Sequence, residues 1–261
     1  MSTTLPTGLE APPQAFVSPA TRMWVTIPLL VLQSIFIVFA AAANLGALIA
    51  FAGWFPGTSA EGFETAALFA EIFTLVFLAL TGIAFISWHR RLIRNLPAVG
   101  CPAPDPSIVW ATWAWLLPIV NLFVPYRSFQ QIARNARTAS ARRPTGLVDA
   151  WWLAWIASIV ADATSAVLMR IPEGPTRRVL EAGSTLAGNG AELLAAGLAL
   201  ALLVVLTRGQ EREAAIVAAE RRAWVTDPSG VTPPPSMPQV ASPPALARPP
   251  RETTGETSQD P

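Results

Sequence analysis

Long apolar runs constrain this chain more than any other feature, because each is long enough to cross a lipid bilayer as a helix. The first extends from Trp24 to Trp54, and about 20 such residues span a membrane. It is too long for the apolar core of a cleavable signal peptide, so we interpret it as a retained spanning helix. Similar runs follow at 66–88, 147–169 and 180–206. Only 13% of the residues are charged, about half the level of a soluble domain.

A fifth segment, residues 107–124, is apolar enough to enter the membrane but carries prolines that break a helix. Pro118 interrupts it and Pro125 ends it. From Tyr126 to Ala136, apolar residues share one helical face and polar residues take the others, which is typical of a helix lying at the membrane surface. The pattern leaves two alternatives for 107–125: a full crossing, or a segment that re-enters or lies at the interface.

Arginine placement favours one of these alternatives and also predicts the orientation. All 18 basic residues are arginines. If 107–125 does not cross, every arginine except Arg170, Arg177 and Arg178 falls on the side that holds both termini, whereas a full crossing divides the arginines more evenly. Cytoplasmic segments carry the excess of basic residues. We therefore predict four spanning helices, a re-entrant or interfacial segment, and cytoplasmic termini in the plasma membrane.

Tryptophans support the same orientation. Their amphipathic rings prefer the headgroup level, so we interpret them as membrane anchors. Those near the arginine-rich side are Trp24, Trp88, Trp110, Trp113, Trp115, Trp151, Trp152 and Trp155. The predicted fold is an all-α, polytopic transmembrane helical bundle.

The predicted organisation of the chain has four parts. Residues 1–22 are polar and contain prolines, and they form a disordered N-terminal tail. Residues 23–207 form the transmembrane helical domain, and 208–225 continue its last helix as a charged cytoplasmic extension. Residues 226–261 are rich in proline, serine and threonine and form a second disordered tail.

A series of tryptophan, arginine, asparagine and proline residues surrounds the broken segment. Its members are Trp88, Arg91, Asn95, Trp115, Pro118, Asn121, Pro125, Trp151 and Trp152. Backbone groups that proline frees at membrane depth must find partners, and the Asn121 side chain can supply one. Arg91 and Asn95 share a face of the preceding helix and can donate to the remaining carbonyls. We favour this structural role over the alternative, a substrate or ion site at a discontinuous helix.

In this order and spacing, the series resembles the bacterial membrane family called domain of unknown function 4328, which is typical of actinobacteria. The resemblance covers about residues 25–207. It implies several spanning helices and a proline-rich disordered tail, although in the family that tail is more often N-terminal. The family brings no assigned activity, so the resemblance bears on fold and location and leaves the function open.

The sequence lacks familiar catalytic and metal-binding patterns. Cys101 is the only cysteine and His89 the only histidine, which excludes an internal disulfide, cysteine-based metal clusters and most zinc or triad chemistry. Ser128, Ser140 and Ser158 have no candidate base except His89. A formal net charge of +1 implies no nucleic-acid partner. We predict a protein that is not an enzyme and binds no cofactor or metal.

Three acidic residues lie within apolar runs, where an ionised carboxylate is costly. They are Glu71, Asp162 and Glu192, in the predicted outer half or near the midplane. Imprecise boundaries and hydrogen bonds between helices explain them most simply, and an outward-facing acidic cavity for a cation or proton, formed chiefly by Asp162 and Glu192, is the alternative. We predict a membrane scaffold that contacts the lipid bilayer and binds proteins through its cytoplasmic face and tail. A small transporter or channel is the second hypothesis, and a lipid-acting enzyme is the third.

Overall fold

The structure is a computed structural model, and it describes residues 15–226 apart from 53, 55–58, 103, 106, 136–143 and 173. Within this part of the chain every regular element is helical. Four helices there are long and apolar enough to cross a membrane, which confirms the predicted fold class. They are α1 (Ala20–Phe51), α2 (Glu61–Asn95), α6 (Thr145–Leu168) and α7 (Pro175–Thr226).

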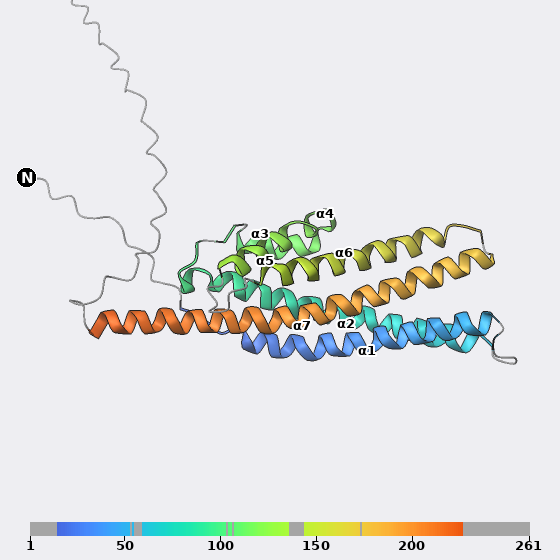
Figure 1. The fold of residues 1–261 in the computed structure, drawn as a ribbon, viewed down its shortest axis with the longest axis horizontal. Coiled ribbons are helices and arrows are strands. Elements are labelled where there is room, and N and C mark those ends of the chain that lie inside the picture. Colours follow the sequence, from blue (N-terminus) through green and yellow to red (C-terminus); the bar gives the residue numbers. More distant parts are fainter. Residues whose placement is uncertain are drawn as a thin grey trace, which may run out of the picture.

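The four long helices form two hairpins that pack side by side. Helix α1 packs along α2, α6 packs along α7, and α1 joins the hairpins through its contact with α7 (Figure 1). We call the end with the turns after α1 and after α6 the loop end, which lies on the right in Figure 1. The opposite end, where α1 begins and α2 ends, is the arginine-rich end. Helix α7 projects beyond the other helices there.

The broken segment forms a hairpin at the arginine-rich end. Its elements are α3 (Ile108–Trp113), η2 (Ala114–Leu116), α4 (Pro118–Asn121) and α5 (Val124–Asn135). Its two arms meet at a bend of 114°. Helix α3 contacts α5, and α4 lies at the tip, partway along α6 (Figure 1). The chain therefore enters and leaves at the same end, and we call residues 108–135 the re-entrant hairpin.

Proline chemistry explains where this hairpin turns. Leu117, which precedes Pro118, is extended (φ −101°, ψ 110°), as expected for a residue whose helical conformation clashes with the following ring. Pro118 then opens α4, where a missing N–H costs nothing because the first helical turn has no carbonyl to donate to. The structure confirms the predicted proline-broken segment.

Several predicted boundaries shift by a few residues. Helix α1 begins at Ala20, so the last three residues of the predicted N-terminal tail are helical. Helix α2 begins at Glu61 rather than residue 66, because Glu61 and Glu64 favour the positive end of the helix dipole. After α2 the chain forms a 3-10 turn, η1 (Pro97–Val99), which ends at Gly100 with φ 74°. The predicted tails before residue 15 and after residue 226 lie outside the described residues.

The best-packed core lies towards the arginine-rich end, where the re-entrant hairpin fills the space beside α2 and α6. Phe129 of α5 is fully buried against the rings of Phe85, Trp88 and Trp151. The expectation that the tryptophans are membrane anchors is wrong for Trp88, Trp151 and Trp152, which are buried in this core. The reason is that the re-entrant hairpin packs over them, so that their rings contact Phe129 or Tyr126. The expectation agrees with the exposure of Trp24, Trp110 and Trp113.

Candidate functional site

His89 of α2 holds the re-entrant hairpin through two hydrogen bonds whose directions can be assigned. Trp115 Nε1 lies 3.3 Å from His89 Nδ1, and an indole N–H can only donate, so Nδ1 is an acceptor. A neutral imidazole then carries its proton on Nε2, which donates to Ser128 Oγ at 2.7 Å. The Ser128 hydroxyl in turn donates to the Pro125 carbonyl at 2.8 Å. The chain of bonds ties both arms of the hairpin to α2.

This arrangement bears on the question of whether Ser128 and His89 form a catalytic pair. A base that activates serine must accept the hydroxyl proton, whereas here the imidazole N–H donates to the hydroxyl oxygen. Both side chains are also buried and enclosed by the rings of Trp115 and Phe129. The Ser128–His89 bond therefore acts as a structural link between α5 and α2.

A second set of polar contacts joins α2 to α7. Trp88 Nε1 donates to Thr207 Oγ1 at 3.0 Å, and Asn95 Nδ2 donates to Gln210 Oε1 at 3.2 Å. Gln210 Nε2 returns a bond of 2.8 Å to the Leu92 carbonyl. These partners are buried, so each bond replaces water that is excluded from the helix interface.

The asparagine of this set also fixes the start of the described chain. Asn95 Nδ2 donates to the Val17 carbonyl at 2.9 Å, and the Val17 N–H lies 3.4 Å from Asn95 Oδ1. We had predicted that Arg91 and Asn95 donate to carbonyls of the broken segment, and the structure differs. On α2, Asn95 faces α7, whereas Phe85 and His89 contact the hairpin. Trp88 lies between them, with its Nε1 on Thr207 of α7 and its ring against Phe129. Helical geometry thus places Asn95 on the wrong side for the predicted role.

The predicted role of Asn121 is not seen either. Its Oδ1 atom is buried and has no hydrogen-bond partner among the described residues. The backbone around the prolines satisfies itself through short-range bonds. Asn121 N donates to Leu117 O at 2.7 Å, and Phe123 N donates to Val120 O at 3.1 Å. Backbone hydrogen bonds within tight turns therefore satisfy the groups for which the sequence predicts the asparagine side chain as partner.

Helix α5 is joined to α6 by contacts that sequence reasoning missed. Tyr126 Oη donates to Asp149 Oδ1 at 2.8 Å, and Gln130 Nε2 donates to the same carboxylate oxygen. Tyr126 also packs on Trp152, whose ring stacks in turn near Trp155. Tyr126 from the apolar face and Gln130 from the polar face of the predicted amphipathic helix therefore both bind a neighbouring helix.

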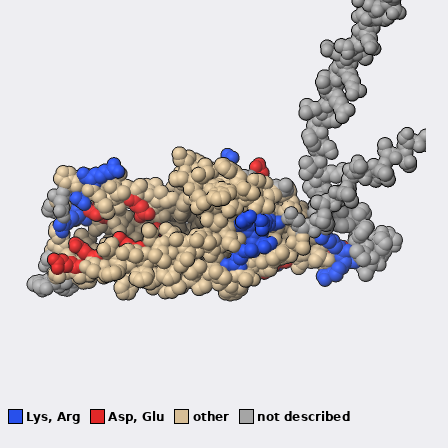
Figure 2. Space-filling model, turned by 180° about the vertical axis from the view of Figure 1, so that it is seen from behind, with Lys and Arg blue, Asp and Glu red and all other residues tan. Residues whose placement is uncertain are grey.

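A polar cleft of about 490 Å³ separates the two hairpins at the loop end. Figure 2 shows acidic and basic side chains around this hollow. The charged residues that line it are Glu64, Glu71, Arg177, Arg178 and Glu181. Arg177 and Glu181 pair at 3.4 Å, and the Arg178 guanidinium lies 4.5 Å from the centre of the Phe51 ring. Much of the cleft's charge is thus already engaged within the protein.

Of the three predicted intramembrane acids, Asp162 and Glu192 lie near each other, and Glu71 lies apart from them. Glu71 lines the cleft, whereas Asp162 and Glu192 lie in the α6–α7 hairpin and do not line it. A Cβ added to Gly188 would lie 3.0 Å from Asp162 Oδ1, so this glycine allows α6 to approach α7 closely. Asp162 and Glu192 are near enough for their negative charges to repel each other. Among the described residues, no group of three or more acidic, histidine or cysteine side chains could hold a metal ion.

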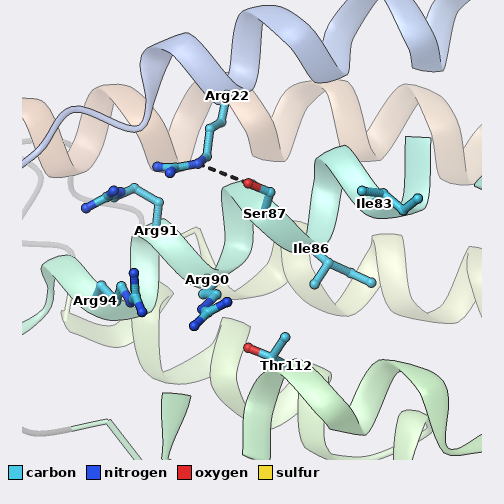
Figure 3. A pocket seen from close by; sticks show the side chains of 8 residues that line it. All are labelled: Arg22, Ile83, Ile86, Ser87, Arg90, Arg91, Arg94 and Thr112. Atoms are coloured by element: carbon cyan, nitrogen blue, oxygen red, sulfur yellow. Dashed lines mark hydrogen bonds between the residues drawn. The ribbon is translucent and has the colours of Figure 1, made fainter. Parts of the chain in front are cut away.

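A basic pocket of about 230 Å³ lies near the arginine-rich end, between α1, α2 and α3. Figure 3 shows its lining, and Figure 2 shows basic side chains gathered on this flank of the bundle. The lining residues are Arg22, Ile83, Ile86, Ser87, Arg90, Arg91, Arg94 and Thr112. Of these, only Arg91 belongs to the predicted series. The run of arginines after Trp88 is a sequence signal for a basic site, but the sequence does not show that Arg22 packs beside this run.

A comparison with known protein families found one family model that matches most of the described helices. The family model described as Domain of unknown function (DUF4328) matches residues 56–209, from the loop before α2 to a point beyond Thr207 in α7. The match contains every member of the predicted series, together with His89 and Phe129. The search of curated proteins and the search of solved structures gave no match. Because the family model covers more than half of the chain, this protein belongs to the family of the domain of unknown function DUF4328.

Proposed function

We propose that this protein is a non-enzymatic, multi-pass protein of the plasma membrane that binds a cytoplasmic protein partner through the projecting end of α7. The observation that supports the proposal most is the exposure of this end. Helix α7 runs on to Thr226, and no side chain from Ala214 to Ala223 is buried. We call residues 208–226 the α7 extension.

The composition of the α7 extension indicates that another molecule covers it. Residues 215–219 are five consecutive apolar residues, and they form an apolar surface around the whole circumference of the helix. Ile216 among them is 49% exposed. Helices that are apolar all round are normally buried. Residue 215 lies about 14 Å beyond Leu206, the end of the apolar run, so this band stands outside the hydrocarbon layer. A protein surface therefore suits it better than lipid does.

The charges beside this band favour a different protein over a second copy. Arg212 precedes the band, Glu220 and Arg221 follow it, and all three are exposed. Two copies in one membrane run parallel, so pairing through this band would bring the same arginines close together. We propose a partner that offers an apolar groove with residues of both charges at its rim, because Glu220 and Arg221 adjoin the band.

Photo-crosslinking tests this proposal in living cells. With a photoreactive amino acid at position 216, we expect one discrete adduct that contains a second, different protein. Adding Ala219→Glu, one turn further on the same face, should remove the adduct because it places a charge in the apolar contact. The control places the same photoreactive residue at Ile83, which is 69% exposed on the apolar surface of α2. This position should give no discrete protein adduct. Adducts made only of two copies of this chain, or none at position 216, would contradict the proposal.

The proposal also requires the arginine-rich end to be cytoplasmic, and Cys101 reports on that. This residue is the only cysteine and is partly buried beside η1. We expect a membrane-impermeant maleimide to leave Cys101 unlabelled in intact cells and to label it once detergent opens the membrane. A Cys101→Ser variant with Ser59→Cys, exposed at the loop end, should label in intact cells. The reverse labelling pattern would place the α7 extension outside the cell and contradict the proposal of a cytoplasmic partner.

The cleft at the loop end supports a second candidate, a small transporter or channel, less well. Its volume would admit a small polar solute. However, its lining mixes both signs of charge, Arg177 is paired with Glu181, and Asp162 and Glu192 lie elsewhere. A cation site needs uncompensated carboxylates, so this cleft is a weak candidate for one. The predicted acidic cavity formed chiefly by Asp162 and Glu192 is a separate place in the fold and stays a prediction.

A further inference from the structure

The basic pocket near the arginine-rich end holds positive charge that no carboxylate in the described part of the chain neutralises. Arg22, Arg90, Arg91 and Arg94 line it, and none of them forms an ion pair with a carboxylate among the described residues. The three arginines of α2 repel the charge of Arg22. Arg91 Nε is buried and has no hydrogen-bond partner in the described part of the chain. Several guanidinium groups held together without an acid favour a bound anion.

The polar atoms of the pocket suit an oxyanion. Arg22 Nε donates to Ser87 Oγ at 3.0 Å, which orients the hydroxyl and leaves its proton free to donate. In Figure 3, Arg22 reaches from α1 towards α2, while Arg90 and Arg94 extend from α2. Guanidinium groups from two helices thus approach one space from different sides. Arginine forks bind phosphate oxygens in pairs, so phosphate is the anion that this set fits best.

One end of the pocket is apolar, and this identifies the source of the phosphate. Ile83, Ser87, Arg90 and Arg94 follow one another along a single stripe of α2. Along about 16 Å of the helix, the side chains of this stripe change from apolar at Ile83 to charged at Arg94. Ile83 is 69% exposed on the apolar belt of the bundle, and Trp113 of neighbouring α3 is 59% exposed. A soluble phosphate would gain nothing from this apolar end, whereas acyl chains would lie along it.

We propose that this pocket binds the phosphate headgroup of an anionic phospholipid, with the acyl chains along Ile83 and the outer face of α3. Basic pockets between membrane helices recognise anionic headgroups in this way, by combining charge with a position at the interface. The site involves none of the residues of the α7 extension, so it is independent of the proposed protein partner.

Native mass spectrometry of the purified full-length protein tests the lipid site. The probes are dioleoyl phosphatidylglycerol and, for comparison, zwitterionic dioleoyl phosphatidylcholine. We expect one phosphatidylglycerol to be retained in preference to phosphatidylcholine. The variant Arg90→Gln/Arg91→Gln/Arg94→Gln should weaken that retention by about tenfold or more. The control Arg208→Gln/Arg212→Gln/Arg221→Gln removes the same charge from exposed positions of the α7 extension and should retain the lipid as the parent does.

Each other outcome overturns the proposal in a recognisable way. Equal losses in the two triple variants would mean diffuse attraction to positive charge rather than a pocket. Competition by inorganic phosphate or glycerol 3-phosphate at the concentration of the lipid would mean a soluble anion as the ligand. If the pocket variant does not fold, Arg91→Lys decides, because lysine keeps the charge and loses the planar fork. Parental affinity for phosphatidylglycerol in that variant would refute recognition by the arginine fork.

Discussion

Phe129→Ala is expected to lower the free energy of unfolding by about 3–5 kcal/mol, the range for removing a fully buried aromatic ring. The Phe129 ring lies within 6.5 Å, centre to centre, of the rings of Phe85, Trp88, His89, Trp115 and Trp151. Removing it leaves a cavity where α2, α6 and the re-entrant hairpin meet, so we expect the hairpin to detach first. The measurement is the thermal melting of purified protein in detergent, followed by tryptophan fluorescence.

The same hairpin offers a matched control. Phe123 is also a phenylalanine of this segment, but it is 60% exposed on the apolar surface. Phe123→Ala removes the same atoms without opening a cavity, so its melting temperature should stay close to that of the parent. If the two variants melt at the same temperature, the buried aromatic cluster does not hold the hairpin in place.

Asn95→Leu should cause the second large loss, because leucine keeps the volume and removes every hydrogen bond. The substitution deprives Gln210 Oε1 and the Val17 carbonyl of their donor. Gln210 is buried, and a polar group left buried and unpaired costs about 1–3 kcal/mol, whereas Val17 is exposed and its carbonyl costs less. We expect a lower melting temperature and a chain in which α7 packs less tightly on α2. Hydrogen exchange at Thr207 and Gln210 would report that loosening directly.

Asn121→Leu supplies the comparison, because the same change is made where no bond is lost. Asn121 Oδ1 has no partner among the described residues, so leucine removes a buried, unpaired oxygen. We expect this variant to be as stable as the parent or slightly more stable. A loss as large as that of Asn95→Leu would show that Asn121 has a partner, such as water or lipid, which its protein neighbours do not provide.

The sequence carried enough information to predict the membrane architecture. Apolar runs fix the long helices because each must bury its backbone hydrogen bonds internally. Pro118 marks the break of the fifth segment, and the structure places the turn of the hairpin there. The continuation of α2 to Asn95 and of α7 past its apolar run also agree with expectation. These features depend on local chemistry, which a single sequence records.

The candidate sites depended on which helix faces which, and this is where prediction failed. Trp88 was expected at a lipid interface, but the re-entrant hairpin covers it. Asn95 was expected to face the hairpin, but it faces α7, some 115 residues further along the chain. The basic pocket needs Arg22 beside Arg91, and nothing in the local pattern links these two positions. Contacts between distant segments require the packing angles of whole helices, which the hydrophobic pattern leaves undetermined.

The unbroken course of α7 has a mechanical consequence. Its 52 residues rise by about 1.5 Å each, so the helix is a rod of about 78 Å. One end of the rod carries Arg177 and Glu181 in the cleft, and the other carries the α7 extension. A tilt of about 10° around one end displaces the other by about 14 Å, more than the width of a helix. By geometry alone, a small change of angle at one end of α7 thus corresponds to a large displacement at its other end.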